Sequence, residues 1–126
     1  MASRWWTVVV DCTDVRLVAD FWKQVLDWQV VYESDTEMVI AKDEHTYPGI
    51  VFGTVPEAKT IKNRLHIDLN PDDQDAEVER LIGLGAKPLD DLRKADGTGW
   101  VVFEDPEGNE FCLLRSEAEI QAPAQS

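Results

Sequence analysis

The pattern of apolar and polar positions occurs twice along the chain. In the first half, an apolar and β-branched run over residues 5–11 predicts a buried strand, and Thr13 or Asp14 then provides a helix N-cap. The apolar positions of this helix, which ends at residues 27–28, form one wide face: Leu17, Val18, Phe21, Trp22, Val25 and Leu26. Residues 29–33, 37–42 and 49–55 follow as three predicted strands of a meander.

The second half repeats this order. Residues 65–70 predict a strand, residues 71–73 a helix cap, and Gly85 the end of a helix. Three further strands are expected at residues 87–92, 100–104 and 110–115, the last two joined by the turn residues 105–109. Residues 6–11 align with residues 65–70. The repeat predicts an α+β fold of two βαβββ modules, and a ferredoxin-like α+β pair is the competing topology.

The repeat also sets the expected domain organisation. Module one is expected at about residues 5–57, a linker at about 58–63 and module two at about 64–115, followed by a tail over 116–126 that frays. Look-alike modules usually pack face to face and share a core. We therefore expect a single domain over residues 1–126, with a curved, cup-like eight-stranded sheet, both helices outside it and one cavity between the modules.

Composition narrows the class of protein. With 126 residues, 44% of them apolar and 29% charged, the chain is typical of a globular domain. A net charge of −13 repels phosphate backbones and anionic lipid, which argues against nucleic-acid and membrane partners. No apolar run approaches the ~20 residues of a membrane span, and the first residues lack a signal core. Cys12 and Cys112 have no CxxC spacing and favour a reducing cytoplasm, although a disulfide between them stays open.

Three segments resemble the vicinal oxygen chelate superfamily, which includes glyoxalase I, extradiol dioxygenases, fosfomycin-resistance enzymes and bleomycin-binding proteins. They are residues 20–28, residues 64–69 (Arg-Leu-His-Ile-Asp-Leu) and residues 103–114, which hold an Asp-Pro-Glu-Gly-Asn turn before a strand. Over about residues 5–115 the chain is most similar to the small glyoxalase-like proteins of this group. The resemblance implies the two-module fold, a ligand cavity and a homodimer.

The metal enzymes of this superfamily hold a divalent ion with one side chain from each of four strands. Carried over to this chain, the four positions fall on Thr7, on residues 50–53 without a carboxylate, on His66, and on Cys112 where glutamate is usual. A catalytic divalent site needs about three protein ligands and an open position. We therefore expect no metal and no other cofactor.

Several polar residues are nonetheless candidates for chemistry. Strand alternation puts Asp68 on the same face as His66, and Asp11 on the same face as Thr7. His66 is a candidate ligand, base or hydrogen-bonding group, and it could form a nucleophile–base pair with Cys112. A cysteine is also a common small core residue.

Glu110 shares the face of Cys112 and is a candidate general base, unless it pairs with Arg64 or Arg115. Trp22 is expected in the core, whereas Trp100 at the start of the last hairpin is the preferred surface for stacking a flat ligand.

These candidates define one expected pocket, lined by Thr7, Asp11, His66, Asp68, Trp100 and Cys112. We expect a metal-free protein of the bleomycin-resistance kind that binds a small organic molecule there. The alternative is a glyoxalase-like lyase or isomerase acting on a small oxygenated substrate, with His66 as ligand or base. A third possibility is an interaction module with a closed cup. Exposed aromatic residues at the module edges also favour a homodimer.

Overall fold

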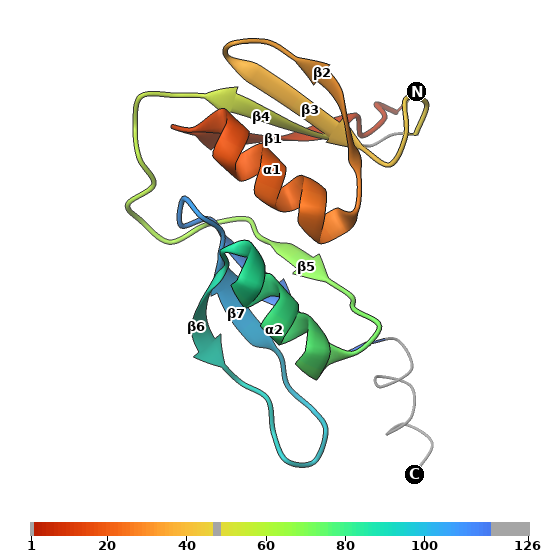
Figure 1. The fold of residues 1–126 in the computed structure, drawn as a ribbon, viewed down its shortest axis with the longest axis vertical. Helices are drawn as coiled ribbons and strands as arrows, with labels where there is room; N and C mark the ends of the chain where they lie inside the picture. Colours follow the sequence, from red (N-terminus) through yellow and green to blue (C-terminus); the bar gives the residue numbers. More distant parts are fainter. Residues whose placement is uncertain (1, 47–48, 117–126) are drawn as a thin grey trace. The chain divides into compact units, whose positions relative to one another are not determined.

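The computed structural model describes residues 2–46 and 49–116, so the predicted tail over 117–126 and the end of the loop at 47–48 lie outside the described residues. The chain divides into two compact units, residues 1–59 and 60–126, which we call module one and module two (Figure 1). The division falls inside the predicted linker. The joint cup and the action of both modules as one domain stay predictions.

Module one is a four-stranded sheet with one helix. Its strands lie in the order β1-β4-β3-β2, with β1 parallel to β4 and the other pairs antiparallel. Figure 1 shows the helix lying against one face of this sheet. The elements are β1 (Thr7–Cys12), α1 (Val15–Leu26), β2 (Gln29–Glu33), β3 (Glu37–Ala41) and β4 (Gly49–Thr54).

Module two repeats this topology with a second sheet. Its strands lie in the order β5-β8-β7-β6, and β5 again runs parallel to the last strand. The elements are β5 (Ile67–Leu69), α2 (Gln74–Leu84), β6 (Lys87–Asp91), β7 (Val101–Glu104) and β8 (Glu110–Leu113). The described chain therefore holds two βαβββ modules in an α+β fold, which confirms the predicted class and excludes the ferredoxin-like alternative.

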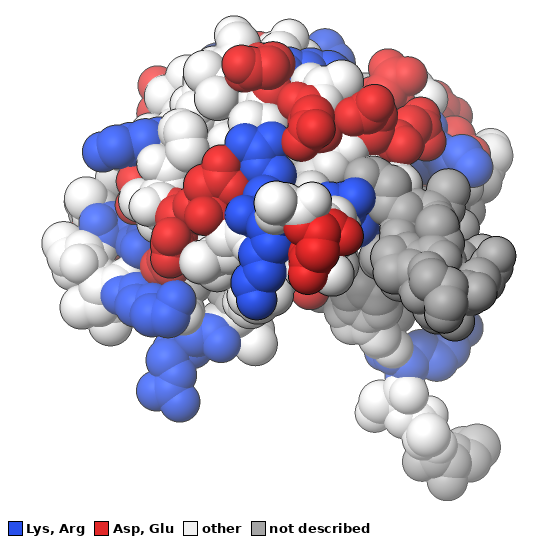
Figure 2. Space-filling model, turned by 90° about the horizontal axis from the view of Figure 1, so that it is seen from below, with Lys and Arg blue, Asp and Glu red and all other residues white. Residues whose placement is uncertain are grey.

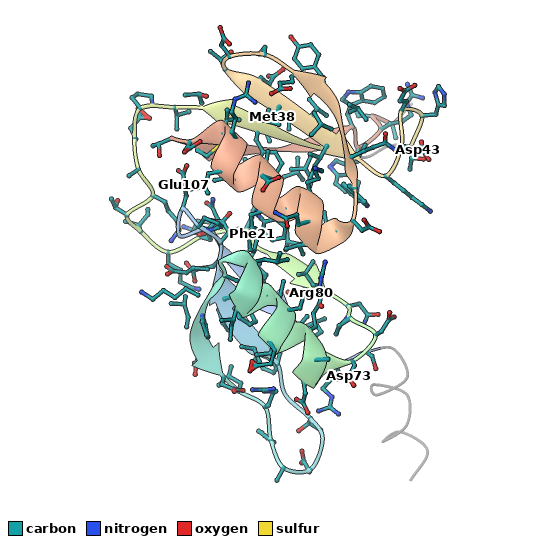
Figure 3. The ribbon with its side chains drawn as sticks, in the orientation of Figure 1. Phe21, Met38, Asp43, Asp73, Arg80 and Glu107 are labelled. Carbon is teal, nitrogen blue, oxygen red and sulfur yellow. The ribbon has the colours of Figure 1, made fainter. Side chains whose placement is uncertain are left out.

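Local sequence signals fix both helices. The Asp14 carboxylate accepts the backbone N–H of Leu17 at 3.1 Å and caps α1. Asp73, which is labelled in Figure 3, caps α2 in the same way by accepting the backbone N–H of Ala76. Gly85 ends α2 with φ of 114°, a conformation that glycine adopts without strain. The buried face of α1 differs from the predicted one, because Leu17 is exposed whereas Val15 and Ala19 are buried.

Each module has its own apolar core between helix and sheet. In module one, Phe21 and Trp22 of α1 are buried, as predicted for Trp22, together with Met38 of β3 (Figure 3). In module two, Phe103 and Phe111 stack with ring centroids 5.5 Å apart and are fully buried. Because these two side chains are buried on one face of β7 and β8, the alternate side chains of both strands lie on the opposite face of this sheet.

The structure also bears on the cysteines, on membrane-spanning helices and on the distribution of charge. Cys12 and Cys112 are both free, so no disulfide joins them. Among the residues that the structure describes, no helix is long and apolar enough to cross a membrane. Figure 2 shows acidic and basic side chains interspersed on one face, so the negative charge is not gathered into a single patch on that face.

Candidate functional site

A row of chemically distinct side chains projects from the sheet of module two on the face away from its helix. The parallel pairing of β5 with β8 puts Asp68 opposite Cys112, and the antiparallel pairing of β8 with β7 puts Cys112 opposite Val102. Their neighbours Phe103 and Phe111 point into the core. Strand alternation therefore places one carboxylate, one thiol and one apolar side chain next to each other on the outer face.

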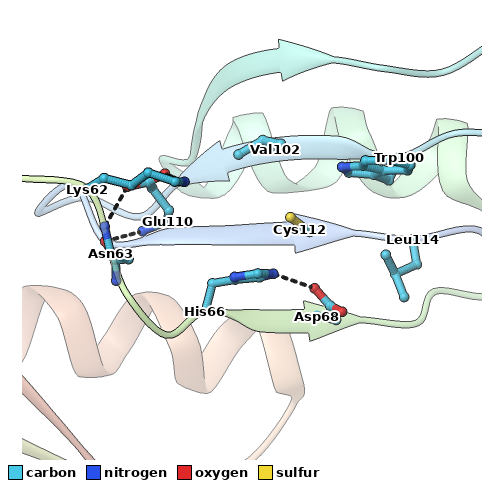
Figure 4. Close-up of a pocket in the computed structure, with 9 residues that line it drawn as sticks. All are labelled: Lys62, Asn63, His66, Asp68, Trp100, Val102, Glu110, Cys112 and Leu114. Atoms are coloured by element: carbon cyan, nitrogen blue, oxygen red, sulfur yellow. Dashed lines mark hydrogen bonds and ion pairs between the residues drawn. The ribbon is translucent and has the colours of Figure 1, made fainter.

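These residues line a hollow of about 460 Å³, within the range typical of small-molecule sites. All nine lining residues belong to module two, and we call this cavity the module-two hollow (Figure 4). Trp100 and Leu114 lie at one end, and Lys62, Asn63 and Glu110 at the other. The middle is formed by His66, Asp68, Val102 and Cys112. The hollow thus has an aromatic, apolar end and a charged end.

His66 and Asp68 form a pair at the centre of the hollow. His66 Nε2 lies 3.2 Å from Asp68 Oδ1, and the two side chains are 50% and 51% exposed (Figure 4). One ligand atom from each of His66, Asp68 and Cys112 lies within 4.8 Å of the others. His66 directly precedes β5, which begins later than predicted, so the position of its side chain depends on the Asp68 contact and on the chain entering the strand.

The surroundings of Cys112 disfavour ionisation of its thiol. Burial raises its pKa above the ordinary value, and the carboxylates of Asp68 and Glu110 raise it further, while Lys62 lowers it. Loss of the proton would place a second negative charge beside Asp68 in a partly desolvated site. This environment is unlike that of activated cysteines, so it weakens the expected role of Cys112 as a nucleophile paired with His66.

Glu110 is anchored at the charged end of the hollow. Its Oε1 accepts from Lys62 Nζ at 3.0 Å, its Oε2 accepts from the backbone N–H of Asn63 at 2.9 Å, and its side chain is only 12% exposed. The backbone N–H of Glu110 donates to Asn63 Oδ1 at 3.2 Å. Lys62 and Asn63 are partners that the sequence did not suggest, and through them Glu110 anchors the segment before β5.

The predicted site residues fall into two groups. His66, Asp68, Trp100, Glu110 and Cys112 come together in the module-two hollow, as Figure 4 shows. Thr7 and Asp11 belong to module one and are not among the residues lining this hollow; their share in the same pocket stays a prediction.

Thr7 hydrogen-bonds within its own sheet, since its Oγ1 donates to the carbonyl of Gly49 at 2.9 Å. The matching register in module one pairs Val9 with Val51, where module two pairs Asp68 with Cys112. The two modules thus share the same strand register, but at these positions module one has valines where module two has Asp68 and Cys112.

Sequence reasoning missed Lys62, Asn63, Val102 and Leu114. The first two were assigned to the linker, although they contact Glu110, which is 48 and 47 residues away in the sequence. The available signal was the period-two alternation of β8 and of its neighbouring strand, which places Val102 beside Cys112 and extends the same face to Leu114.

Comparisons with known structures agree on the fold. A glyoxalase/bleomycin resistance protein/dioxygenase family enzyme from Burkholderia phytofirmans PsJN superposes with a TM-score of 0.66, at 21% identity over 86% of this chain and 95% of that one. The fosfomycin resistance protein FosX from Listeria monocytogenes, complexed with Mn(II) and sulfate ion, gives 0.73 at 17% identity over 100% of both chains. FosX from Mesorhizobium loti gives 0.68 at 18% identity, over 97% of this chain and 99% of that one.

Sequence comparison assigns the family. No curated protein matches the chain. The model of the glyoxalase-like domain, however, matches residues 7–114 and so spans both modules. Together with the repeated βαβββ topology, this match confirms the resemblance to the vicinal oxygen chelate superfamily, and the protein belongs to the glyoxalase-like domain family.

Proposed function

We propose that the protein binds a small organic molecule in the module-two hollow. The observation that carries the proposal is the division of this cavity, whose volume is about 460 Å³, into an apolar end and a charged end. Sites for small molecules combine an apolar wall with a few convergent polar groups. The hollow contains both, on strands held by a buried aromatic core.

Trp100 is the main contact expected at the apolar end. It is 45% exposed and lines the cavity together with Val102 and Leu114. A flat ring stacked on an aromatic side chain gains about 0.5–1.5 kcal/mol beyond the area that it buries. A planar ligand is therefore favoured over a branched aliphatic one.

The charged groups favour a ligand that carries a cation or hydrogen-bond donors. Lys62 is already paired with Glu110, so these two charges largely compensate each other. Asp68 contacts His66 but remains half exposed, which leaves carboxylate surface for a ligand. A donor on the ligand would form a charge-assisted hydrogen bond with it, the stronger class of such bonds.

The proposed binding uses no Mn(II), the ion named for the Listeria protein. The convergent donors are one imidazole nitrogen, one carboxylate oxygen and one cysteine sulfur, from His66, Asp68 and Cys112. Mn(II) is suited to carboxylate, carbonyl and water oxygens, and a thiol is a poor ligand for it. This donor set does not fit Mn(II), so the ligand contacts are assigned to side chains alone.

A glyoxalase-like lyase or isomerase is the second candidate function. It is favoured by the 3.2 Å contact between Asp68 and His66, because a carboxylate that orients an imidazole suits proton transfer to or from a substrate. Turnover of small oxygenated substrates that is lost in His66→Gln, with binding retained, would support an enzyme. Binding without turnover would support the small-molecule binding function instead.

We also propose a homodimer located in the cytoplasm. The exposed side chains of Trp5 and Trp6 support an interface, and the free Cys12 and Cys112 are compatible with a reducing compartment. Sedimentation equilibrium should give twice the monomer mass, whereas a single monomer mass across micromolar concentrations would contradict the dimer.

A fluorescence screen tests the binding proposal. Flat cationic and neutral compounds are titrated into chelator-treated protein, and quenching of tryptophan emission reports binding. Trp100→Ala should weaken a hit by about tenfold, or ~1.4 kcal/mol. Trp28→Ala is the matched control and should not, because Trp28 belongs to module one and does not line the hollow. Asp68→Asn should weaken cationic compounds more than neutral ones. Unchanged affinity in folded Trp100→Ala and His66→Ala would place the pocket elsewhere.

A further inference from the structure

We infer that His66, Asp68 and Cys112 form a binding site for a borderline-soft divalent ion of the zinc type, contained within module two. This inference goes beyond the proposed ligand binding and does not depend on it. It also departs from the metal-free expectation drawn from the sequence. That expectation considered one ligand position on each of four strands, and of these His66 and Cys112 carry donor atoms. Asp68 lies outside those four positions and adds a third donor.

The geometry is close to that of a metal site before an ion binds. The ligand atoms of the three residues lie within 4.8 Å of one another, and His66 Nε2 and Asp68 Oδ1 are already 3.2 Å apart. For tetrahedral zinc with bonds of about 2.0–2.3 Å, neighbouring ligand atoms are about 3.3–3.8 Å apart. Modest side-chain rotations are enough to bring the three ligand atoms to these separations.

The backbone holds two of the three ligands in fixed positions. Asp68 and Cys112 are direct partners in the parallel pairing of β5 and β8. The next residue along β8, Leu113, is fully buried, as is Phe111 before it. Because ligands on rigid, well-packed strands lose little conformational entropy on binding an ion, this arrangement favours the site.

The types of donor select the ion. Zinc accepts thiolate, imidazole and carboxylate ligands, and sites with three protein ligands keep a fourth position open. Here the half-exposed His66 and Asp68 border the module-two hollow, so the open position would face a cavity that solvent reaches. Hard ions such as Mn(II) gain little from the sulfur donor.

The remaining charges around the site do little to oppose a cation. Glu110 lines the same hollow and is held by Lys62 and Asn63, so it adds negative charge without being one of the three convergent ligands. Lys62 opposes the cation, but its side chain is 83% exposed and its ammonium group already contacts Glu110. Solvent therefore screens much of this repulsion.

Cobalt(II) is a spectroscopic probe that tests the inference without any organic ligand. Full-length protein is treated with a chelator and titrated with cobalt chloride under nitrogen. A thiolate bound to cobalt gives an intense charge-transfer band in the near ultraviolet, and we expect this band to saturate at one equivalent. Zinc chloride should then abolish the band by displacing cobalt, and manganese chloride at the same concentration should not.

Two cysteine variants assign the sulfur. Cys112→Ser should lose the band. Cys12→Ser should keep it, because Cys12 is buried in module one and donates to the carbonyl of Gly53. His66→Gln and Asp68→Asn alter half-exposed side chains, so these variants should fold, and they should weaken cobalt binding by about tenfold or more. Circular dichroism verifies folding for all four variants.

The inference is overturned if wild-type protein shows no charge-transfer band. It is also overturned if the band survives in Cys112→Ser, or if Cys12→Ser removes it while the protein stays folded. Unchanged cobalt affinity in both His66→Gln and Asp68→Asn would equally reject the three-residue site. None of these results bears on the fluorescence screen, which uses chelator-treated protein and organic compounds.

Discussion

Replacing Asp105 should destabilise the turn that joins β7 to β8 and thereby the strand that carries Cys112. Asp105 is only 3% exposed. Its Oδ1 accepts the backbone N–H groups of Glu107 at 2.9 Å and Asn109 at 3.0 Å, and its Oδ2 accepts Asn109 Nδ2 at 3.0 Å. The backbone N–H of Asp105 also donates to the Asn109 carbonyl at 2.8 Å. One carboxylate therefore organises the whole turn.

The expected magnitude follows from these three bonds. A hydrogen bond to a charged group contributes about 1.5–3 kcal/mol, and donors left unsatisfied after truncation cost further. Because the three bonds share one side chain, their contributions do not add fully. We expect Asp105→Ala to lower the free energy of unfolding by about 3 kcal/mol. Asp105→Asn keeps one acceptor oxygen but turns an amide NH₂ toward Asn109, so a loss of about 1 kcal/mol is expected.

Urea denaturation with linear extrapolation measures these differences. Asp96→Ala is the matched control, because Asp96 makes the same kind of contacts in the loop between β6 and β7, to the backbone N–H of Thr98 at 2.9 Å and to its Oγ1 at 2.6 Å. Asp96 is exposed, so water can replace its bonds and the loss should be much smaller. Equal losses in Asp105→Ala and Asp96→Ala would refute the assignment of stability to the buried turn.

Two further predictions concern pH. The raised pKa of Cys112 predicts that iodoacetamide alkylates it more slowly than free cysteine at pH 8, with the rate still rising above the ordinary pKa of 9.0; rapid modification at pH 7 in a Cys12→Ser background would contradict this. Hydrogen bonds from Arg93 lower the pKa of Asp91 from 3.8 to about 2, so the resulting stability is present above 3.8 and is lost as the pH falls toward 2. Arg93→Gln should therefore reduce the fall of the urea midpoint as the pH is lowered through this range. An unchanged dependence of the midpoint on pH would contradict the pairing of Arg93 with Asp91.

Much of the fold was predictable because its signals are local. The cap at Asp14, the glycine stop at Gly85 and the strand alternation all act within a few residues, so the pattern of the chain contains them. The start of β5 is different. Leu65 is apolar and extends the predicted strand, yet it is 87% exposed, and pairing with β8 begins only at Ile67. Where a strand begins depends on its partner, and this information is absent from its own sequence.

The candidate site shows the same limit. Alternation was enough to place Asp68 and Cys112 on the outer face of their strands. It gave no means of finding Lys62 or Asn63, because their contacts with Glu110 join segments that are far apart in the sequence. Alternation also placed Asp68 beside His66, but the position of Cys112 opposite Asp68 depends on the register of β5 and β8, which links two distant segments.

The central claim is that the module-two hollow is where the protein binds a small molecule, and mapping of amide chemical shifts tests it most directly. A compound that quenches tryptophan emission is titrated into ¹⁵N-labelled full-length protein. The account predicts that the largest shifts occur at Trp100, Val102 and Cys112 and at the residues around Asp68. Saturable shifts confined to residues 1–59, with those four positions unchanged, would contradict it.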